Sequence, residues 1–106
     1  MNMSHRIQFD AIPWKDSQSG ARYKAWTGAA KQVRILELTK AFVEQEWCEK
    51  AHVLYVLSGE LELTFLQGDT ECFAEGDLAI INFEDKHKPR ALSPVVTLLL
   101  LEENEP

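Results

Sequence analysis

The stretch ELELTF at residues 60–65 alternates polar and apolar side chains at every position. Successive side chains of a β-strand point to opposite faces of a sheet, so strict alternation is typical of a strand with one buried face. Just before it, HVLYVL at residues 52–57 is rich in β-branched and aromatic residues and ends at the turn signal Ser58-Gly59. The two stretches predict consecutive strands joined by a tight turn.

Short strands and turns continue to the end of the chain. We expect further strands at residues 70–73, 78–82, 90–92 and 95–101, separated by the turn signals QGD (67–69), EGD (75–77) and SP (93–94). Residues 10–32 read as loop with one short strand at 22–27. Many short strands at close spacing predict an all-β sandwich or barrel.

Residues 38–50 can be interpreted in two ways. The apolar residues Leu36, Val43, Trp47 and Leu54 also fit helical spacing, and good helix formers lie between them. Local sequence therefore leaves a helix open. The neighbouring strands favour strand, loop, strand.

Size and charge limit the class of protein. The 106 residues suit one domain, and the 45% hydrophobic content is enough for one core. The formal net charge of −6 argues against non-specific binding to nucleic acid or to an anionic membrane surface. The longest apolar stretch, at 95–101, is too short to span a bilayer, and residues 1–10 lack the apolar run of a secretory signal.

Two cysteines, Cys48 and Cys72, do not make a disulfide framework. We therefore expect a cytoplasmic protein with reduced thiols. Cys72 is interpreted as a plain buried thiol.

Four side chains are candidates for metal binding: Glu46, Cys48, His52 and His87. If the segment is extended, the first three point to one face because even spacing keeps side chains on one side. Carboxylate, thiolate and imidazole all bind divalent transition metals. Singly, the last three also have structural interpretations: a small buried cysteine, a core histidine, and a histidine in a charged turn.

The arrangement of these residues resembles the cupin superfamily. The pattern E-x-C-(x)3-H-(x)6-G at 46–59 has the spacing of the first cupin motif and runs into GELEL at 59–63. The pattern G-(x)5-N-x-E-(x)2-H at 76–87 has the spacing of the second. The string WCEKAH at 47–52 resembles, more closely, the small cupin-fold proteins named for a DHCW motif.

The resemblance implies one cupin-type double-stranded β-helix, a jelly-roll barrel, within a single domain at residues 1–106. Its barrel core would cover about 33–102, after an N-terminal loop and short strand at 1–32. The family's ligand positions fall on Glu46, Cys48, His52 and His87. The chain departs from the pattern, because glutamate replaces the first histidine, cysteine the second, and histidine the acidic ligand.

Such a ligand set suits Zn²⁺, Fe²⁺, Ni²⁺ or Cu²⁺ better than Mg²⁺ or Ca²⁺, which prefer oxygen ligands. Four protein ligands would fill a tetrahedral zinc shell, whereas catalysis needs an open position. Three interpretations follow: a metal-binding cupin with a small-molecule ligand in its barrel, a structural zinc protein, and a metal-free, non-enzymatic ligand-binding or interaction module. Whether the protein is an enzyme stays open, although oxygenation or isomerisation of a small organic acid would suit the fold.

The substrate pocket is expected to include Arg34, Trp47 and Lys50. Arg34 would hold an anionic ligand by paired hydrogen bonds if it points inward, and would be solvated surface if it points outward. The three tryptophans are interpreted as core or dimer-interface residues. The apolar strand at 95–101 favours a homodimer.

Overall fold

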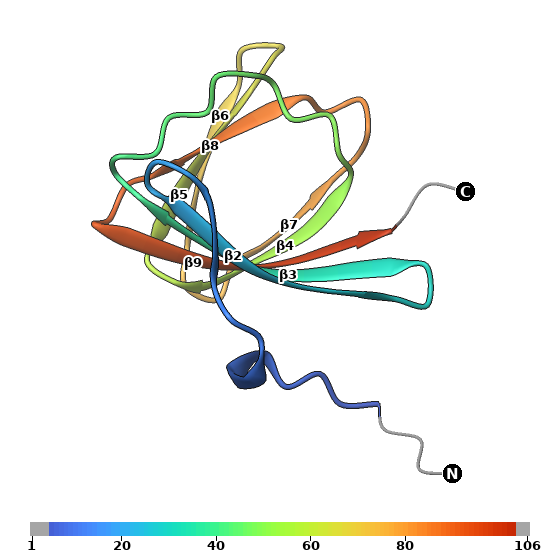
Figure 1. Cartoon of the computed structure of the whole chain (residues 1–106). Coiled ribbons are helices and arrows are strands. Elements are labelled where there is room, and N and C mark those ends of the chain that lie inside the picture. Colours follow the sequence, from blue (N-terminus) through green and yellow to red (C-terminus); the bar gives the residue numbers. More distant parts are fainter. Residues whose placement is uncertain (1–4, 104–106) are drawn as a thin grey trace, which may run out of the picture.

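The computed structural model describes residues 5–103, which form nine strands in two antiparallel sheets (Figure 1). The elements are η1 (Phe9–Ala11), β1 (Lys15–Gln18), β2 (Ala21–Gly28), β3 (Lys31–Thr39), β4 (His52–Ser58), β5 (Glu60–Phe65), β6 (Thr70–Ala74), β7 (Leu78–Ile81), β8 (His87–Ala91) and β9 (Val95–Glu103). The larger sheet has the order β1-β2-β3-β9-β4-β7, and the smaller has β6-β5-β8. The all-β prediction is confirmed.

The core lies between the two sheets, where the alternating strands direct their apolar side chains. In β5, Leu61 and Leu63 are fully buried, as the alternation at 60–65 predicts. In the larger sheet, β9 lies between β3 and β4, so that Leu98 pairs with Leu36 on one side and Val56 on the other. One face of β9 is therefore buried at the centre of the sheet.

A tight turn at Gly59 carries the chain from the larger sheet into the smaller one. Its φ of +86° is the left-handed region that favours glycine. A Cβ atom there would overlap the carbonyl oxygen of Val95. The Ser58-Gly59 turn signal thus marks the point where the two sheets meet.

Residues 38–50 are not a helix. Strand β3 runs to Thr39, and the chain is then irregular until β4 begins at His52, except for a bridge between Cys48 and His87. The prediction of one short strand before residue 33 was incomplete, because β1 and the start of β3 also lie there. All four side chains of β1 are exposed, so it carries no alternation signal.

Part of the outer face of the larger sheet is apolar, beside the ion pair of Arg22 and Glu37. In-register neighbours Trp26, Val33, Leu101, Val53 and Ile80 form one row across it, and a second row joins Ile35, Leu99, Tyr55 and Leu78. Ile80 is 71% exposed and Leu78 is 52% exposed. Together, these two rows form the outer apolar face.

Within residues 5–103, no tryptophan belongs to the buried core. Trp26 lies on the outer apolar face, and Trp14 packs under the cationic groups of Arg22 and Lys24 at 4.2 and 4.9 Å. The described chain also has no helix with the length and apolarity needed to cross a membrane.

Candidate metal centre and its cavity

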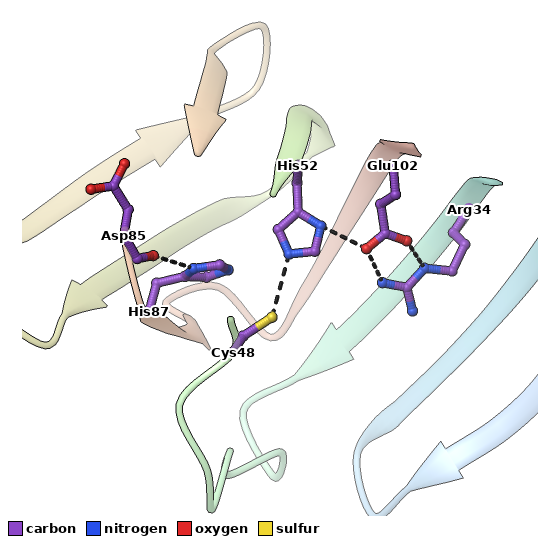
Figure 2. A network of polar contacts seen from close by, with 6 residues as sticks. All are labelled: Arg34, Cys48, His52, Asp85, His87 and Glu102. Atoms are coloured by element: carbon purple, nitrogen blue, oxygen red, sulfur yellow. Dashed lines mark hydrogen bonds and ion pairs between the residues drawn. The ribbon is translucent and has the colours of Figure 1, made fainter. Parts of the chain in front are cut away.

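Cys48, His52 and His87 converge at one end of the space between the sheets (Figure 2). One ligand atom from each lies within 4.8 Å of the other two. His52 begins β4 of the larger sheet, His87 begins β8 of the smaller sheet, and Cys48 lies in the loop between β3 and β4. Both histidines are buried, and Cys48 is half-buried.

A two-way backbone contact places Cys48 beside His87. The N–H of Cys48 donates to the carbonyl of His87 at 2.8 Å, and the N–H of His87 donates back at 3.1 Å. This is the pattern of a hydrogen-bonded antiparallel pair, in which both side chains emerge on the same side. The loop is thereby anchored at the residue that carries the sulfur.

Strand register explains how His52 meets Glu102. Val53 pairs with Leu101, so the next residues, His52 and Glu102, face each other on the inner side. Nδ1 of His52 contacts a carboxylate oxygen of Glu102 at 2.7 Å, and Nε2 lies 3.4 Å from the sulfur of Cys48. Because a carboxylate only accepts, the proton of the neutral ring belongs on Nδ1. In the neutral ring Nε2 then faces the cluster with a lone pair, and in the imidazolium it carries an N–H that can donate to the Cys48 thiolate.

Arg34 holds the other side of Glu102. Its Nε donates to one carboxylate oxygen at 2.8 Å, and its Nη2 donates to the other at 3.2 Å. Glu102 is only 6% exposed, so this ion pair is shielded from water. Arg34 therefore points inward, and Glu102 rather than a ligand fills its guanidinium fork (Figure 2).

His87 is oriented by a separate contact. Its Nδ1 lies 2.8 Å from the carbonyl oxygen of Asp85, which only accepts, so Nδ1 carries the proton. The two imidazoles pack edge to face, with centroids 5.1 Å apart. Both rings thus have Nδ1 beside an acceptor, at ion-pair distance in His52 and in a hydrogen bond in His87, with Nε2 toward the cluster, which is the arrangement of metal-binding histidines.

The environment shifts the pKa values of three groups. Burial raises the pKa of the Cys48 thiol, but hydrogen bonds from His52, His87 and the Lys50 backbone outweigh it and lower the pKa to about 6. Burial also raises the pKa of Glu102, but His52 and the charge of Arg34 lower it to about 2. For His52, burial lowers the pKa, and contacts with Cys48 and Glu102 raise it above its ordinary value overall. Thiolate and carboxylate are both favoured near neutral pH.

The cluster opens into a cavity of about 130 Å³ between the sheets. Its apolar lining comes from Ala21, Phe42, Pro89 and six leucines: Leu36, Leu38, Leu54, Leu63, Leu98 and Leu100. Polar lining comes from the cluster, from Arg34, and from Ser17, Gln18 and Glu44. His52 and Glu102 also border a larger open groove of about 440 Å³ on their other side.

The structure brings together three of the four predicted ligands. Glu46 is exposed and lies outside the group formed by Cys48, His52 and His87. The reason is local, because the chain before Cys48 is irregular and even spacing does not keep side chains on one face there. The cavity lining includes Arg34 but not Trp47, which packs against Lys88 at 4.6 Å, or Lys50, which is exposed.

The expectation that Cys72 is buried was wrong. Cys72 is exposed, and in β6 only Phe73 is buried. Alternation places Phe73 on the inner side of the smaller sheet and its neighbours on the outer side.

Glu102 is the site residue that sequence reasoning missed. It continues the inward positions Leu98 and Leu100 at a spacing of two, so the parity of β9 already marked it as buried. A buried glutamate needs a hydrogen-bond or ion-pair partner. The inward position of Glu102 was therefore a sequence signal that could have identified it as part of a polar site.

The donor set fits a divalent transition metal. One thiolate and two imidazole nitrogens are ligands that zinc, iron, nickel and copper accept. Three protein ligands around one point leave a coordination position open, as in catalytic rather than closed structural zinc sites. Glu102 and the Asp85 carbonyl supply the outer contacts that fix both histidines.

Solved structures share this architecture. An RmlC-like cupin from Shewanella frigidimarina NCIMB 400 matches with a TM-score of 0.78 and 13% identity, over 97% of this chain and 93% of that one. The polyketide cyclase RemF from Streptomyces resistomycificus matches with a TM-score of 0.78 and 17% identity, over 97% and 81%. The iron(II) form of HppE matches with a TM-score of 0.74 and 11% identity, over 91% and 58%.

No protein-family model matches the chain, and no curated protein matches it significantly in sequence. The structural matches, at these low identities, show the fold alone. The predicted jelly-roll architecture is confirmed, and the chain has the cupin fold.

Proposed function

We propose that the protein binds one divalent transition-metal ion through Cys48, His52 and His87, and that a small molecule in the adjacent cavity completes its coordination. The observation that carries this proposal is the convergence of three transition-metal donors within 4.8 Å, with both histidines already oriented. Zn²⁺, Fe²⁺, Ni²⁺ and Cu²⁺ suit these donors. The fold is also that of HppE, whose matching structure is the iron(II) form, and this likeness supports a transition-metal ion as the bound group.

The chain's own residues have separate tasks in this proposal. Cys48 supplies one negative charge, Glu102 holds the proton on Nδ1 of His52, and Arg34 fixes Glu102. The leucines of the cavity exclude water from the ligand's apolar part. When bound, the metal would act as a Lewis acid toward an oxygen or nitrogen atom of the ligand.

A closed structural zinc site is less well supported. It requires four protein ligands, and the predicted fourth ligand, Glu46, is exposed and outside the cluster. The open position and the adjoining cavity favour ligand binding.

Metal content tests the proposal. Protein purified without added metal is analysed by mass spectrometry for its elements, then stripped with a chelator and titrated with Zn²⁺. We expect saturation near one equivalent in the wild type and almost none in Cys48→Ala or His87→Ala. Cys72→Ala is the matched control, because Cys72 is exposed and lies on β6, at the opposite edge of the smaller sheet from β8. Equal metal binding by Cys48→Ala and Cys72→Ala would refute the site.

We also propose that two copies pair through the outer apolar face. Two continuous rows of apolar side chains across the strands support this, because single soluble chains rarely expose so large an apolar patch. The string at 47–52 further supports a place for the chain among the small DHCW-motif cupin-fold proteins.

A further inference from the structure

We propose that the cavity selects a small, mostly apolar ligand without a negative charge, and that Glu102 sets this preference by occupying the guanidinium of Arg34. The proposal deepens the proposed function by naming the class of ligand for the same cavity. It concerns the cavity itself, so it can be tested on protein without metal.

The charges around the cavity disfavour an anion. Among the described residues that line it, Arg34 is the sole lysine or arginine. Both of its donors that face Glu102 are engaged, at 2.8 and 3.2 Å. An incoming carboxylate would have to displace a glutamate that is 6% exposed and also contacts His52 at 2.7 Å. The anion would lose its hydration without gaining a cation in return.

The rest of the lining offers an anion no free cation either. The carboxylate of Glu102 is compensated by Arg34 and His52. Glu44, the acidic residue in the lining, is half-buried, and one of its carboxylate oxygens accepts the backbone N–H of Glu46 at 3.4 Å. An anion in the cavity would therefore face the carboxylate of Glu44 and a guanidinium that is already paired.

Size and surface define the rest of the ligand. The cavity volume is about 130 Å³, close to the roughly 150 Å³ of an engineered apolar cavity in another protein that holds benzene. Apolar side chains, chiefly leucines, line much of this space, and Cys48, His52 and His87 form one polar group in its wall. A molecule of about six heavy atoms with one neutral polar end fits this pattern.

Butyramide, butyrate and butylammonium test the preference, because they share a four-carbon chain and differ in the charge of their polar end. Each is titrated into metal-free protein at pH 7 while the leucine methyl signals are followed by NMR. We expect butyramide to bind roughly tenfold more tightly than butyrate. The shifts should be largest for leucines that line the cavity.

Glu102→Gln tests the cause of the preference. The variant releases Arg34 from its ion pair, so butyrate should gain roughly tenfold in affinity relative to butyramide. Glu37→Gln is the matched control, since Glu37 binds Arg22 at the same 2.8 and 3.2 Å but neither residue lines this cavity. Arg34→Met leaves Glu102 without its cation and should instead favour butylammonium, which keeps the test decisive if Glu102→Gln does not fold.

Three results would overturn the proposal. These are a wild-type preference for butyrate over butyramide, an absence of saturable shifts with butyramide, and an unchanged preference in both Glu102→Gln and Arg34→Met. Since no metal is present, none of these results depends on whether the three-ligand site binds an ion.

Discussion

Cys48 and His87 are joined by two backbone hydrogen bonds, of 2.8 and 3.1 Å, that hold a loop residue against the first residue of β8. The contact does not involve either side chain. The sulfur and the imidazole are therefore placed side by side by the main chain.

Two substitutions at residue 48 separate the main-chain role from the sulfur. Cys48→Ala keeps the backbone N–H, so we expect a change in the free energy of unfolding below about 1 kcal/mol and a complete loss of zinc binding. Cys48→Pro removes the N–H that donates to His87, and we expect it to cost about 1–3 kcal/mol. Urea unfolding measures both. Equal destabilisation by the two variants would show that the bridge does not hold the loop.

Glu102→Gln should weaken zinc binding by roughly 10- to 100-fold, because a neutral amide holds the proton on Nδ1 of His52 less well than a carboxylate. Competition with a chromophoric chelator measures the affinity. Glu37→Gln, which disrupts the ion pair with Arg22 outside the cavity, should leave it unchanged. A similar loss in both variants would point to a general effect of removing an ion pair.

The stability of the protein should fall in acid partly because of Glu102. Its pKa is lowered from the ordinary 4.5 to about 2, so the folded state binds this proton less readily than the unfolded state. Its stabilising contribution is complete above pH about 4.5 and is lost as the pH falls toward 2. The difference in the free energy of unfolding between wild type and Glu102→Gln should narrow over this range. A constant difference from pH 7 to pH 2 would contradict the assignment.

The Cys48 thiol should react as a thiolate in mildly acidic solution. With its pKa at about 6, alkylation of metal-free Cys72→Ala protein by iodoacetamide should reach half its maximal rate near pH 6. His52→Ala removes one of the hydrogen bonds that lower this pKa, so the midpoint should move upward. Zinc should block the reaction. A midpoint in the ordinary thiol range for the parent protein would show that His52 and His87 do not stabilise the thiolate.

Ile80→Lys should convert a dimer into a monomer without unfolding the chain. Ile80 is 71% exposed in the single chain and lies within the outer apolar face. A lysine there should therefore cost the folded chain little stability, but it should destabilise a dimer in which a second copy covers this position. Light scattering coupled to size-exclusion chromatography gives the mass. Leu66→Lys is the control, because Leu66 is 51% exposed just beyond β5 and outside that face. A monomer mass for the wild-type protein at tens of micromolar would refute the proposed dimer interface.

Period-two patterns predicted the strands that have one buried and one exposed face. Glu60–Phe65 is the clearest, because Leu61 and Leu63 alternate with less buried residues along the whole strand. The pattern fails for β1, whose side chains are all exposed and which is recruited by main-chain pairing with β2. Such a strand has no alternation of polar and apolar residues from which it could be predicted.

The site was predictable where spacing reflects a shared strand, and less so where it depends on a loop. His52 and His87 begin strands and point inward. Glu46 lies in irregular chain, where even spacing does not keep side chains on one face. Glu102 could be found only by extending the parity of β9 past its apolar run. The partner of Arg34 depends on the register between β3 and β9, which no local pattern specifies.

The three donors do not share a layer. His52 belongs to the six-stranded sheet, His87 to the three-stranded sheet, and Cys48 is tied to the latter through its bridge. A metal ion bound by all three would cross-link the two sheets at this end of the barrel. We expect that removal of the ion would increase the motion between the two sheets at this end before either sheet unfolds.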